Sequence, residues 1–223
     1  NWRKKLNIML TIKKLIKDGA QELRNSQSAR LDSELIICSI LQLSREQLYC
    51  KLNESATEKQ KSTFFELIKK RAIGVPVAYL LNKKEFRSLN FFVDQSVLVP
   101  RPETETLVDL ALEETRVQTR INILELGTGS GIIAASIAKE RPDALIVAID
   151  LSQDAIRVAQ KNLVDLTITN VRLCVGDWFS PIEMKNFFHM VISNPPYVSN
   201  NSHTSLSDSI RFEPNISLYS SNN

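Results

Sequence analysis

Residues 121–131 read Ile-Asn-Ile-Leu-Glu-Leu-Gly-Thr-Gly-Ser-Gly, an apolar run that leads directly into a glycine-rich turn. The run predicts a β-strand, and the Ala- and Ile-rich residues after the turn predict a helix to about residue 140. Further short apolar runs predict strands at residues 145–149, 171–175 and 190–192. Runs this apolar are typical of parallel strands covered on both faces, so we expect an open α/β sheet.

The residues before this sheet follow a different pattern. Residues 1–80 show apolar side chains at helical spacing, and residues 44–47 and 57–60 match the capping box that begins a helix. Gly74 and Pro76 are expected to end the last long helix. From about residue 84 the pattern becomes β-like, including residues 97–99, and predicts a hairpin connector. We therefore expect a helical domain at 1–80, a connector at 81–102 and an α/β domain at 103–223.

Composition excludes several classes of protein. Apolar residues make up 43% and charged residues 24% of the chain, as in globular proteins. There is no apolar run of about 18 residues, and lysines interrupt the stretch near the start, so we expect neither a membrane span nor a secretory leader. Three scattered cysteines and two histidines predict no disulfide framework and no metal site. A cytoplasmic protein with reduced thiols is expected.

The charge is unevenly distributed along the chain. Residues 1–90 contain 18 Lys and Arg against 9 Asp and Glu, whereas residues 91–223 contain 10 against 16. A basic first half suits an acidic partner or RNA. Lysines on the solvated faces of helices produce the same balance, and we favour that interpretation.

The glycine-rich turn is a candidate cofactor loop. Gly127, Gly129 and Gly131, with Thr128 and Ser130 between them, allow a sharp turn and close approach of a ligand to the backbone at a helix start. Both a dinucleotide and S-adenosylmethionine fit such a loop. The spacing is G-x-G-x-G rather than the dinucleotide pattern G-x-G-x-x-G, which favours the methyl donor.

Acidic and aromatic residues follow the next two strands. Asp150 ends the second strand, about 20 residues beyond the glycines, where a carboxylate can accept hydrogen bonds from ribose hydroxyls. Asp177 and Trp178 follow the third strand and suit the edge and face of an adenine. A turn-forming aspartate is the plainer interpretation of Asp177.

The fourth strand leads into Asn194, Pro195, Pro196 and Tyr197. The two prolines fix φ and remove two N–H donors, so the turn presents carbonyl oxygens beside the Asn194 side chain. Such an array accepts hydrogen bonds from a flat N–H₂ group, and Tyr197 can stack on that group. We predict that these four residues hold an amide or amine nitrogen while it is methylated.

Taken together, these residues resemble the HemK/PrmC family, the bacterial glutamine N5-methyltransferases of peptide-chain release factors. The Asn-Pro-Pro-Tyr turn is shared with adenine-N6 methyltransferases of nucleic acids, so the distinguishing segments lie elsewhere. They are residues 71–80, 86–89 and 97–105, the last reading Val-Leu-Val-Pro-Arg-Pro-Glu-Thr-Glu, and Glu213-Pro214.

The resemblance implies a helical substrate-recognition domain and a Rossmann-like class I methyltransferase domain that binds S-adenosylmethionine. The substrate would be the glutamine of the Gly-Gly-Gln motif in release factors, methylated for translation termination. Arg101 and Glu103 would join the Asn194 turn in binding it, and Asn194 would also contact the donor. No metal, membrane or direct nucleic-acid binding is expected.

Two departures from the family pattern stand out. Glu125 replaces the more usual Asp before the glycines, keeping the charge with one more methylene. The α/β domain also shows only four core strands where relatives continue, so we expect an incomplete sheet with the fourth strand at its edge. The alternatives are an adenine-N6 methyltransferase acting on RNA or DNA and a truncated, inactive donor-binding fragment.

Overall fold

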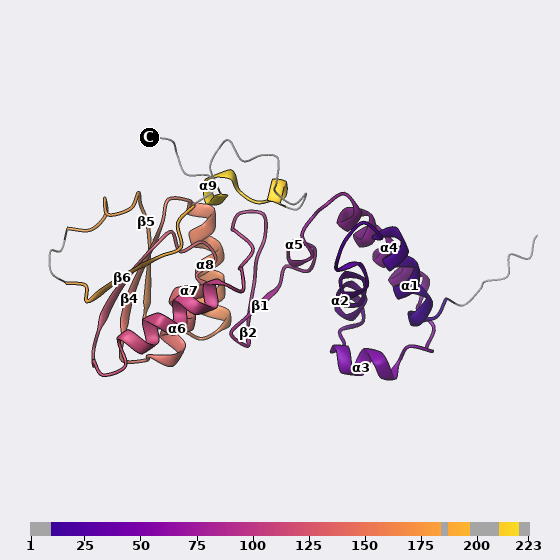
Figure 1. Cartoon of the computed structure of the whole chain (residues 1–223), viewed down its shortest axis with the longest axis horizontal. Coiled ribbons are helices and arrows are strands. Elements are labelled where there is room, and N and C mark those ends of the chain that lie inside the picture. Colours follow the sequence, from indigo (N-terminus) through magenta and orange to yellow (C-terminus); the bar gives the residue numbers. More distant parts are fainter. Residues whose placement is uncertain (1–9, 184–186, 197–209, 219–223) are drawn as a thin grey trace, which may run out of the picture. The chain divides into compact units, whose positions relative to one another are not determined.

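The computed structural model describes residues 10–183, 187–196 and 210–218. The chain divides into two compact units, Asn1–Leu81 and Asn82–Asn223 (Figure 1). Each unit has its own hydrophobic core.

The first unit is helical in all its described elements, as predicted. Both capping boxes form: the Ser44 and Thr57 side chains accept from the backbone N–H of Gln47 and Gln60, whose side chains bond back. The core gathers around the fully buried Phe64. The helices are α1 (Ile12–Glu22), α2 (Ala29–Leu41), α3 (Arg45–Cys50), α4 (Glu58–Ala72) and α5 (Val77–Leu81).

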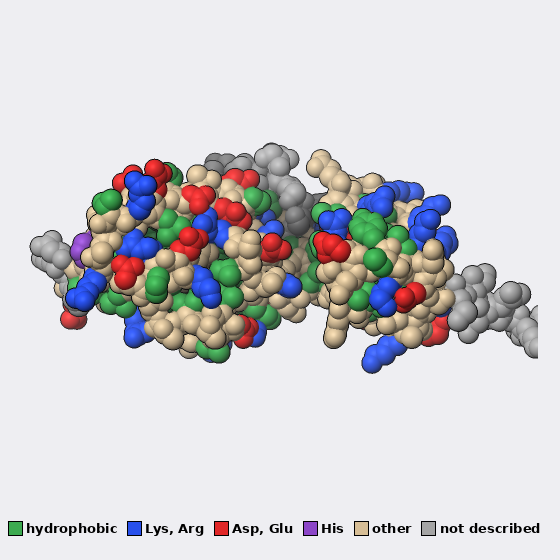
Figure 2. All heavy atoms as spheres, turned by 90° about the horizontal axis from the view of Figure 1, so that it is seen from below, with side chains coloured by type: hydrophobic (Ala, Val, Ile, Leu, Met, Phe, Trp, Pro, Cys, Tyr) green, Lys and Arg blue, Asp and Glu red, His purple; other side chains and the backbone are tan. Residues whose placement is uncertain are grey.

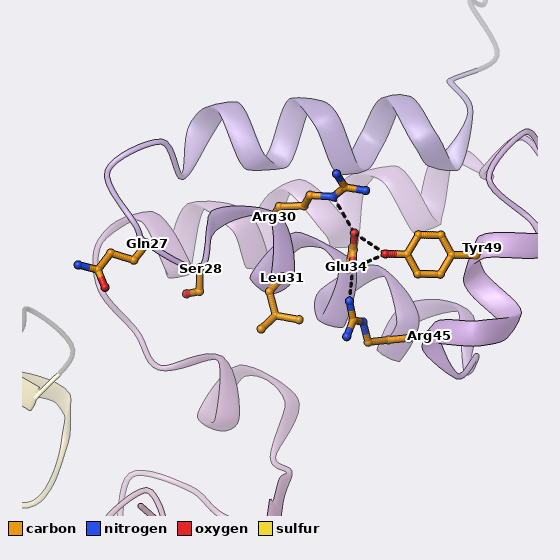
Figure 3. A pocket seen from close by; sticks show the side chains of 7 residues that line it. All are labelled: Gln27, Ser28, Arg30, Leu31, Glu34, Arg45 and Tyr49. Atoms are coloured by element: carbon orange, nitrogen blue, oxygen red, sulfur yellow. Dashed lines mark hydrogen bonds and ion pairs between the residues drawn. The ribbon is translucent and has the colours of Figure 1, made fainter. Parts of the chain in front are cut away.

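A buried carboxylate joins α2 to α3. The Glu34 side chain is only 4% exposed and accepts from Arg30 Nε at 2.9 Å and Arg45 Nη2 at 2.8 Å. The Tyr49 hydroxyl adds a third donor at 3.2 Å. Figure 3 shows all three side chains pointing toward Glu34 at the wall of a surface hollow of about 390 Å³. Two arginines and one glutamate line this hollow, so its charged side chains carry a net positive charge.

Some lysines of the first unit pair with acids three or four residues away. Lys14 bonds Asp18 at 2.6 Å and Lys70 bonds Glu66 at 2.9 Å, both on exposed helix faces. Such pairs support the interpretation of the basic first half as solvated helix surface. On the second unit, the face seen in Figure 2 shows acidic and basic side chains interspersed.

The second unit begins with a short hairpin, β1 (Lys84–Phe86) and β2 (Leu89–Phe91), paired antiparallel. Arg87 and Ser88 form its two-residue turn with φ of 48° and 58°, the values that hairpin turns of this length require. The prediction of β-structure at residues 97–99 was wrong. This segment forms no strand, but Val97 and Val99 are buried, which explains the apolar pattern.

The remainder of the second unit alternates helix and strand. Its strands pair in parallel in the order β5-β4-β3-β6, which confirms the predicted open sheet. The elements are α6 (Thr104–Glu114), β3 (Asn122–Leu126), α7 (Ile132–Glu140), β4 (Leu145–Asp150), α8 (Gln153–Asp165), β5 (Val171–Val175), β6 (Met190–Ser193), η1 (Ile210–Phe212) and α9 (Asn215–Leu218).

The two faces of this sheet are covered differently. Helices α6, α7 and α8 lie on one face, where they form the larger core with the hairpin (Figure 1). On the other face, the described residues that pack on Leu124, Leu126 and Ile149 include Ile182 and Phe188 and belong to no helix. Coverage by helices on both faces is therefore not seen in the described residues. Among the described strands, β6 lies at one edge of the sheet, as predicted.

Among the described residues, no helix combines the length and apolar character needed to cross a bilayer. In the same part of the chain, no group of three or more His, Cys, Asp or Glu side chains is arranged to hold a metal ion. Cys38, Cys50 and Cys174 are free thiols.

Candidate functional site

The order in which the chain adds strands to the sheet reverses at β3. From β3 the chain adds β4 and β5 on one side and then returns to place β6 on the other side. Leu126 pairs in register with Ser193, whose hydroxyl donates to the Leu126 carbonyl at 2.8 Å. Open α/β sheets bind ligands at such a switch point, outside the carboxyl ends of the strands. The glycine-rich loop and Asn194 therefore begin side by side at this point.

The glycine-rich loop needs its glycines. Gly127, Gly129 and Gly131 have φ of 70°, 55° and 78°, in the left-handed region that side chains disfavour. A Cβ at Gly127 or Gly129 would meet nothing within 4 Å, so the loop presents bare backbone to open space. A Cβ at Gly131 would lie 3.0 Å from that of Ala159 on α8. The first two glycines thus leave room for a ligand, while the third allows close packing on a helix.

Asp150 ties the end of β4 to this loop. Its carboxylate accepts from Gly129 N at 2.7 Å and from Ser152 N at 2.9 Å. Thr128 N also bonds Ile149 O at 2.9 Å, so two bonds fix the loop against β4. Each carboxylate oxygen keeps acceptor capacity for a further donor, such as a ribose hydroxyl. Holding the loop is a role of Asp150 that the spacing of acids and glycines did not predict.

Asp177 and Trp178 lie in the turn after β5, next to the end of β4. Gly176 N donates to Asp150 O at 2.9 Å, which carries the strand pairing into this turn. Trp178 has φ of 48° and is 52% exposed. A large indole left half in solvent just after the end of β5 is available for stacking on a flat ligand. Asp177 is exposed and also shapes the turn, because its carbonyl accepts from Ser180 N at 2.8 Å.

Asn194 lies at the end of β6, with its Nδ2 donating to the Thr104 hydroxyl at 3.4 Å. Pro195 is exposed and Pro196 half-buried. Tyr197 lies outside the described residues, so its predicted stacking role stays a prediction. Glu103 is exposed, immediately before α6, and its side chain makes no capping bond there.

Glu125 is fully buried beneath the loop. Its Oε2 accepts from the Thr128 hydroxyl at 2.8 Å and from Ala134 N at 3.1 Å, while Oε1 has no partner. Burial raises the pKa of Glu125 to about 8, against the weaker opposing effect of these two donors. The side chain is therefore mostly a neutral acid at pH 7. The packing of α7 removes Glu125 from water, which disfavours the charge that the sequence comparison of Glu with Asp assumed.

Two family models match this chain along its length. The PrmC N-terminal domain matches residues 14–81, and the methyltransferase small domain matches residues 104–211. The release factor glutamine methyltransferase of Aliivibrio fischeri is 36% identical over 217 residues, covering 96% of this chain and 76% of that protein. The proteins of the same name from Salmonella typhimurium and Escherichia coli are 38% and 36% identical, covering 92% and 91% of this chain and 74% and 73% of theirs.

The chain belongs to the release factor glutamine methyltransferase family. This confirms the resemblance inferred from residues 71–80, 86–89 and 97–105, and it does not favour the adenine-N6 alternative.

The second unit also contains a buried residue that sequence patterns did not reveal. Asn162 on α8 is 1% exposed; its Oδ1 accepts from Phe92 N at 2.7 Å. Its Nδ2 donates to Phe92 O at 3.0 Å and to Ser130 O at 2.8 Å. One amide thus joins the segment after the hairpin to the glycine-rich loop. Its place on the apolar face of α8, with Ala155, Val158 and Ala159, was the available signal.

The structure also pairs Arg101, a predicted substrate-binding residue, with Glu213. Arg101 Nη2 lies 2.7 Å from Glu213 Oε1, and Val99 N donates to Glu213 Oε2 at 3.2 Å. Glu213 is 4% exposed, and burial raises its pKa although Arg101 opposes the shift. The motif carrying Glu213 had been noted in the sequence, but its partner is 112 residues away.

Proposed function

We propose that this chain transfers the methyl group of S-adenosylmethionine to the side-chain amide nitrogen of the Gly-Gly-Gln glutamine in peptide-chain release factors. The observation that carries the proposal is the register of Leu126 with Ser193, since it sets the glycine-rich loop beside Asn194 at the switch point. A donor site and an acceptor for N–H groups then share one end of the sheet.

The loop fits the donor. Its bare glycines and the N–H groups at the start of α7 suit the amino-acid part of S-adenosylmethionine. Asp150 has remaining acceptor capacity for ribose hydroxyls, and Trp178 offers a half-exposed ring for the adenine. When bound, the sulfonium donor supplies an electrophilic methyl group.

Asn194 and the prolines after it would activate the glutamine amide nitrogen, a poor nucleophile, by orienting it. An amide nitrogen shares its lone pair with the carbonyl, so holding it in line with the methyl group matters more than deprotonating it in advance. Asn194 Oδ1 and the Pro195 carbonyl would accept its two N–H bonds and stabilise the positive charge that develops on nitrogen. Tyr197 would stack on the flat amide.

We assign release factor recognition to the helical unit and to Arg101 and Glu103 of the second unit. The hollow beside Glu34 supports this assignment, because exposed Arg and Tyr side chains are typical of protein interfaces. A substrate that acts in translation would place the enzyme in the cytoplasm.

The decisive experiment incubates this chain with S-adenosylmethionine and a release factor, followed by mass spectrometry of the peptide that contains the Gly-Gly-Gln motif. We expect one added methyl on the glutamine and none when that glutamine is replaced by alanine. Transfer to RNA but not to release factor would support the adenine alternative instead. Donor binding by calorimetry with no transfer to either substrate would indicate an inactive fragment.

A further inference from the structure

Two residues that are far apart in the sequence bond to residues 99–104. Glu213 bonds Val99 and Arg101, and Asn194 bonds Thr104. Thr104, the first residue of α6, is 6% exposed, and its hydroxyl oxygen is the acceptor for Asn194 Nδ2. None of the proposed steps uses this threonine.

The position of Thr104 is itself fixed. Glu213 bonds Arg101 and the backbone of Val99, so the segment entering α6 is anchored to a buried carboxylate. Thr104 N then donates to Arg101 O at 3.1 Å, which closes the turn between the anchor and the hydroxyl. The Thr104 hydroxyl that accepts from Asn194 is therefore linked to Glu213 through the hydrogen bonds of Arg101.

The orientation of the amide decides what Asn194 can do. The terminal torsion of an Asn side chain is broad and roughly two-fold, so its oxygen and nitrogen exchange places at little cost when nothing distinguishes them. Only the orientation with Oδ1 free presents an acceptor to a substrate N–H. In the structure it is Nδ2, and not Oδ1, that is bonded to the Thr104 hydroxyl.

We propose that Thr104 is a positioning residue for Asn194: its hydroxyl oxygen holds Nδ2 and thereby directs Oδ1 toward the nitrogen that receives the methyl group. The inference rests on the proposed function. Thr104 itself touches neither donor nor glutamine.

The test compares Thr104→Val, which keeps the shape and removes the acceptor, with Thr104→Ser, which keeps the hydroxyl. We expect Thr104→Val to lower kcat about tenfold, as loss of one hydrogen bond allows, with donor affinity and the KM for release factor changed less than about twofold. Thr104→Ser should stay within about threefold of the parent. Thr106→Val, on the exposed part of the same helix, is the matched control and should change nothing.

A double-mutant cycle shows whether Thr104 acts through Asn194. If it does, Thr104→Val should cost no further activity in an Asn194→Ala background. A parent-like kcat for Thr104→Val, an equal fall in Thr104→Ser, or full additivity with Asn194→Ala would each overturn the inference.

A measurement that requires no methyl transfer tests this inference independently of the proposed function. The side-chain amide protons of Asn194, assigned in ¹⁵N spectra by their loss in Asn194→Ala, should shift in Thr104→Val and not in Thr104→Ser. If the parent methylates no release factor, the proposed function fails while these spectra still decide the positioning role. Unshifted amide protons in Thr104→Val would show that the hydroxyl does not hold Asn194.

Discussion

Arg101 Nη2 lies 2.7 Å from Glu213 Oε1, a bond that joins the segment before α6 to the segment that follows the Asn194 turn. Glu213 is almost completely buried, whereas the Arg101 side chain is one-third exposed. A buried carboxylate paired from one side and bonded to backbone on the other acts as an anchor, because leaving either charge alone in this environment is costly.

Replacing Glu213 with Gln should lower turnover several-fold while leaving donor affinity unchanged. The amide can still accept from Val99 N, but it no longer attracts Arg101, so the start of α6 is held less firmly. Steady-state kinetics and donor titration calorimetry measure the two quantities. Glu113→Gln, an exposed change near the end of α6, is the control. Loss of donor binding in Glu213→Gln would contradict this role.

Asn194→Ala should lower kcat by about 10²–10³, the scale for losing one preorganised polar contact in a transition state. The release factor should still bind, because the helical unit is unchanged. Single-turnover methyl transfer with a labelled donor measures the rate. A variant within tenfold of the parent would rule out the proposed role of Asn194.

The neutral Glu125 predicts a particular dependence of stability on pH. Its folded pKa of about 8 lies above the ordinary value of 4.5, so the folded protein binds the proton more tightly than the unfolded chain. This contribution to the free energy of unfolding is full below about pH 4.5 and is lost as the pH rises toward 8. Glu125→Gln mimics the protonated acid and should remove that loss, a difference of a few kcal/mol between the two proteins at pH 9.

Denaturant unfolding of both proteins at intervals from pH 5 to pH 9 measures this difference. Other titrating groups contribute equally to both, so the difference isolates Glu125. Parallel curves for the parent and Glu125→Gln would show that the carboxyl is charged when folded.

Asn162→Ala should weaken donor binding about tenfold and lower the free energy of unfolding by about 2 kcal/mol, because buried polar groups of Phe92 and Ser130 lose their partners. Calorimetric donor titration and denaturant unfolding test the two effects. Gln160→Ala, on the exposed face of α8, should change neither. Unchanged donor affinity would limit Asn162 to a purely structural role.

Tyr49→Ala should raise the KM for release factor about tenfold and leave kcat unchanged, as expected for an aromatic residue at the centre of an interface. Glu34 keeps its two arginine partners, so the fold should survive. Val117→Ala, exposed on the second unit, is the control. An unchanged KM would place the contact surface elsewhere.

Much of the fold was predictable from local patterns. The strand at residues 122–126, its glycine turn and both capping boxes depend on neighbours within a few residues, and all were correctly predicted. The segment at 97–99 was not, because a buried run without strand pairing has the same apolar pattern as a strand. The spacing of apolar residues reflects burial more directly than it reflects backbone hydrogen bonding.

The site was predictable to a smaller extent. Residues that follow the strand ends were brought to one edge, since parallel strands end together. The bond between Thr104 and Asn194 spans 90 residues, and the neutral state of Glu125 depends on how α7 packs over it. Neither spacing nor residue type carries that information.

The two hydrophobic cores share no residue: one gathers around Phe64, the other around Ile123 and the face of the sheet beneath α7. Heating this protein should therefore give two calorimetric transitions, one for each unit. If the whole trace were treated as one two-state transition, the van't Hoff enthalpy would be smaller than the calorimetric enthalpy. An added donor should move only the transition of the second unit. The melting curve would then report which half of the molecule a substitution affects.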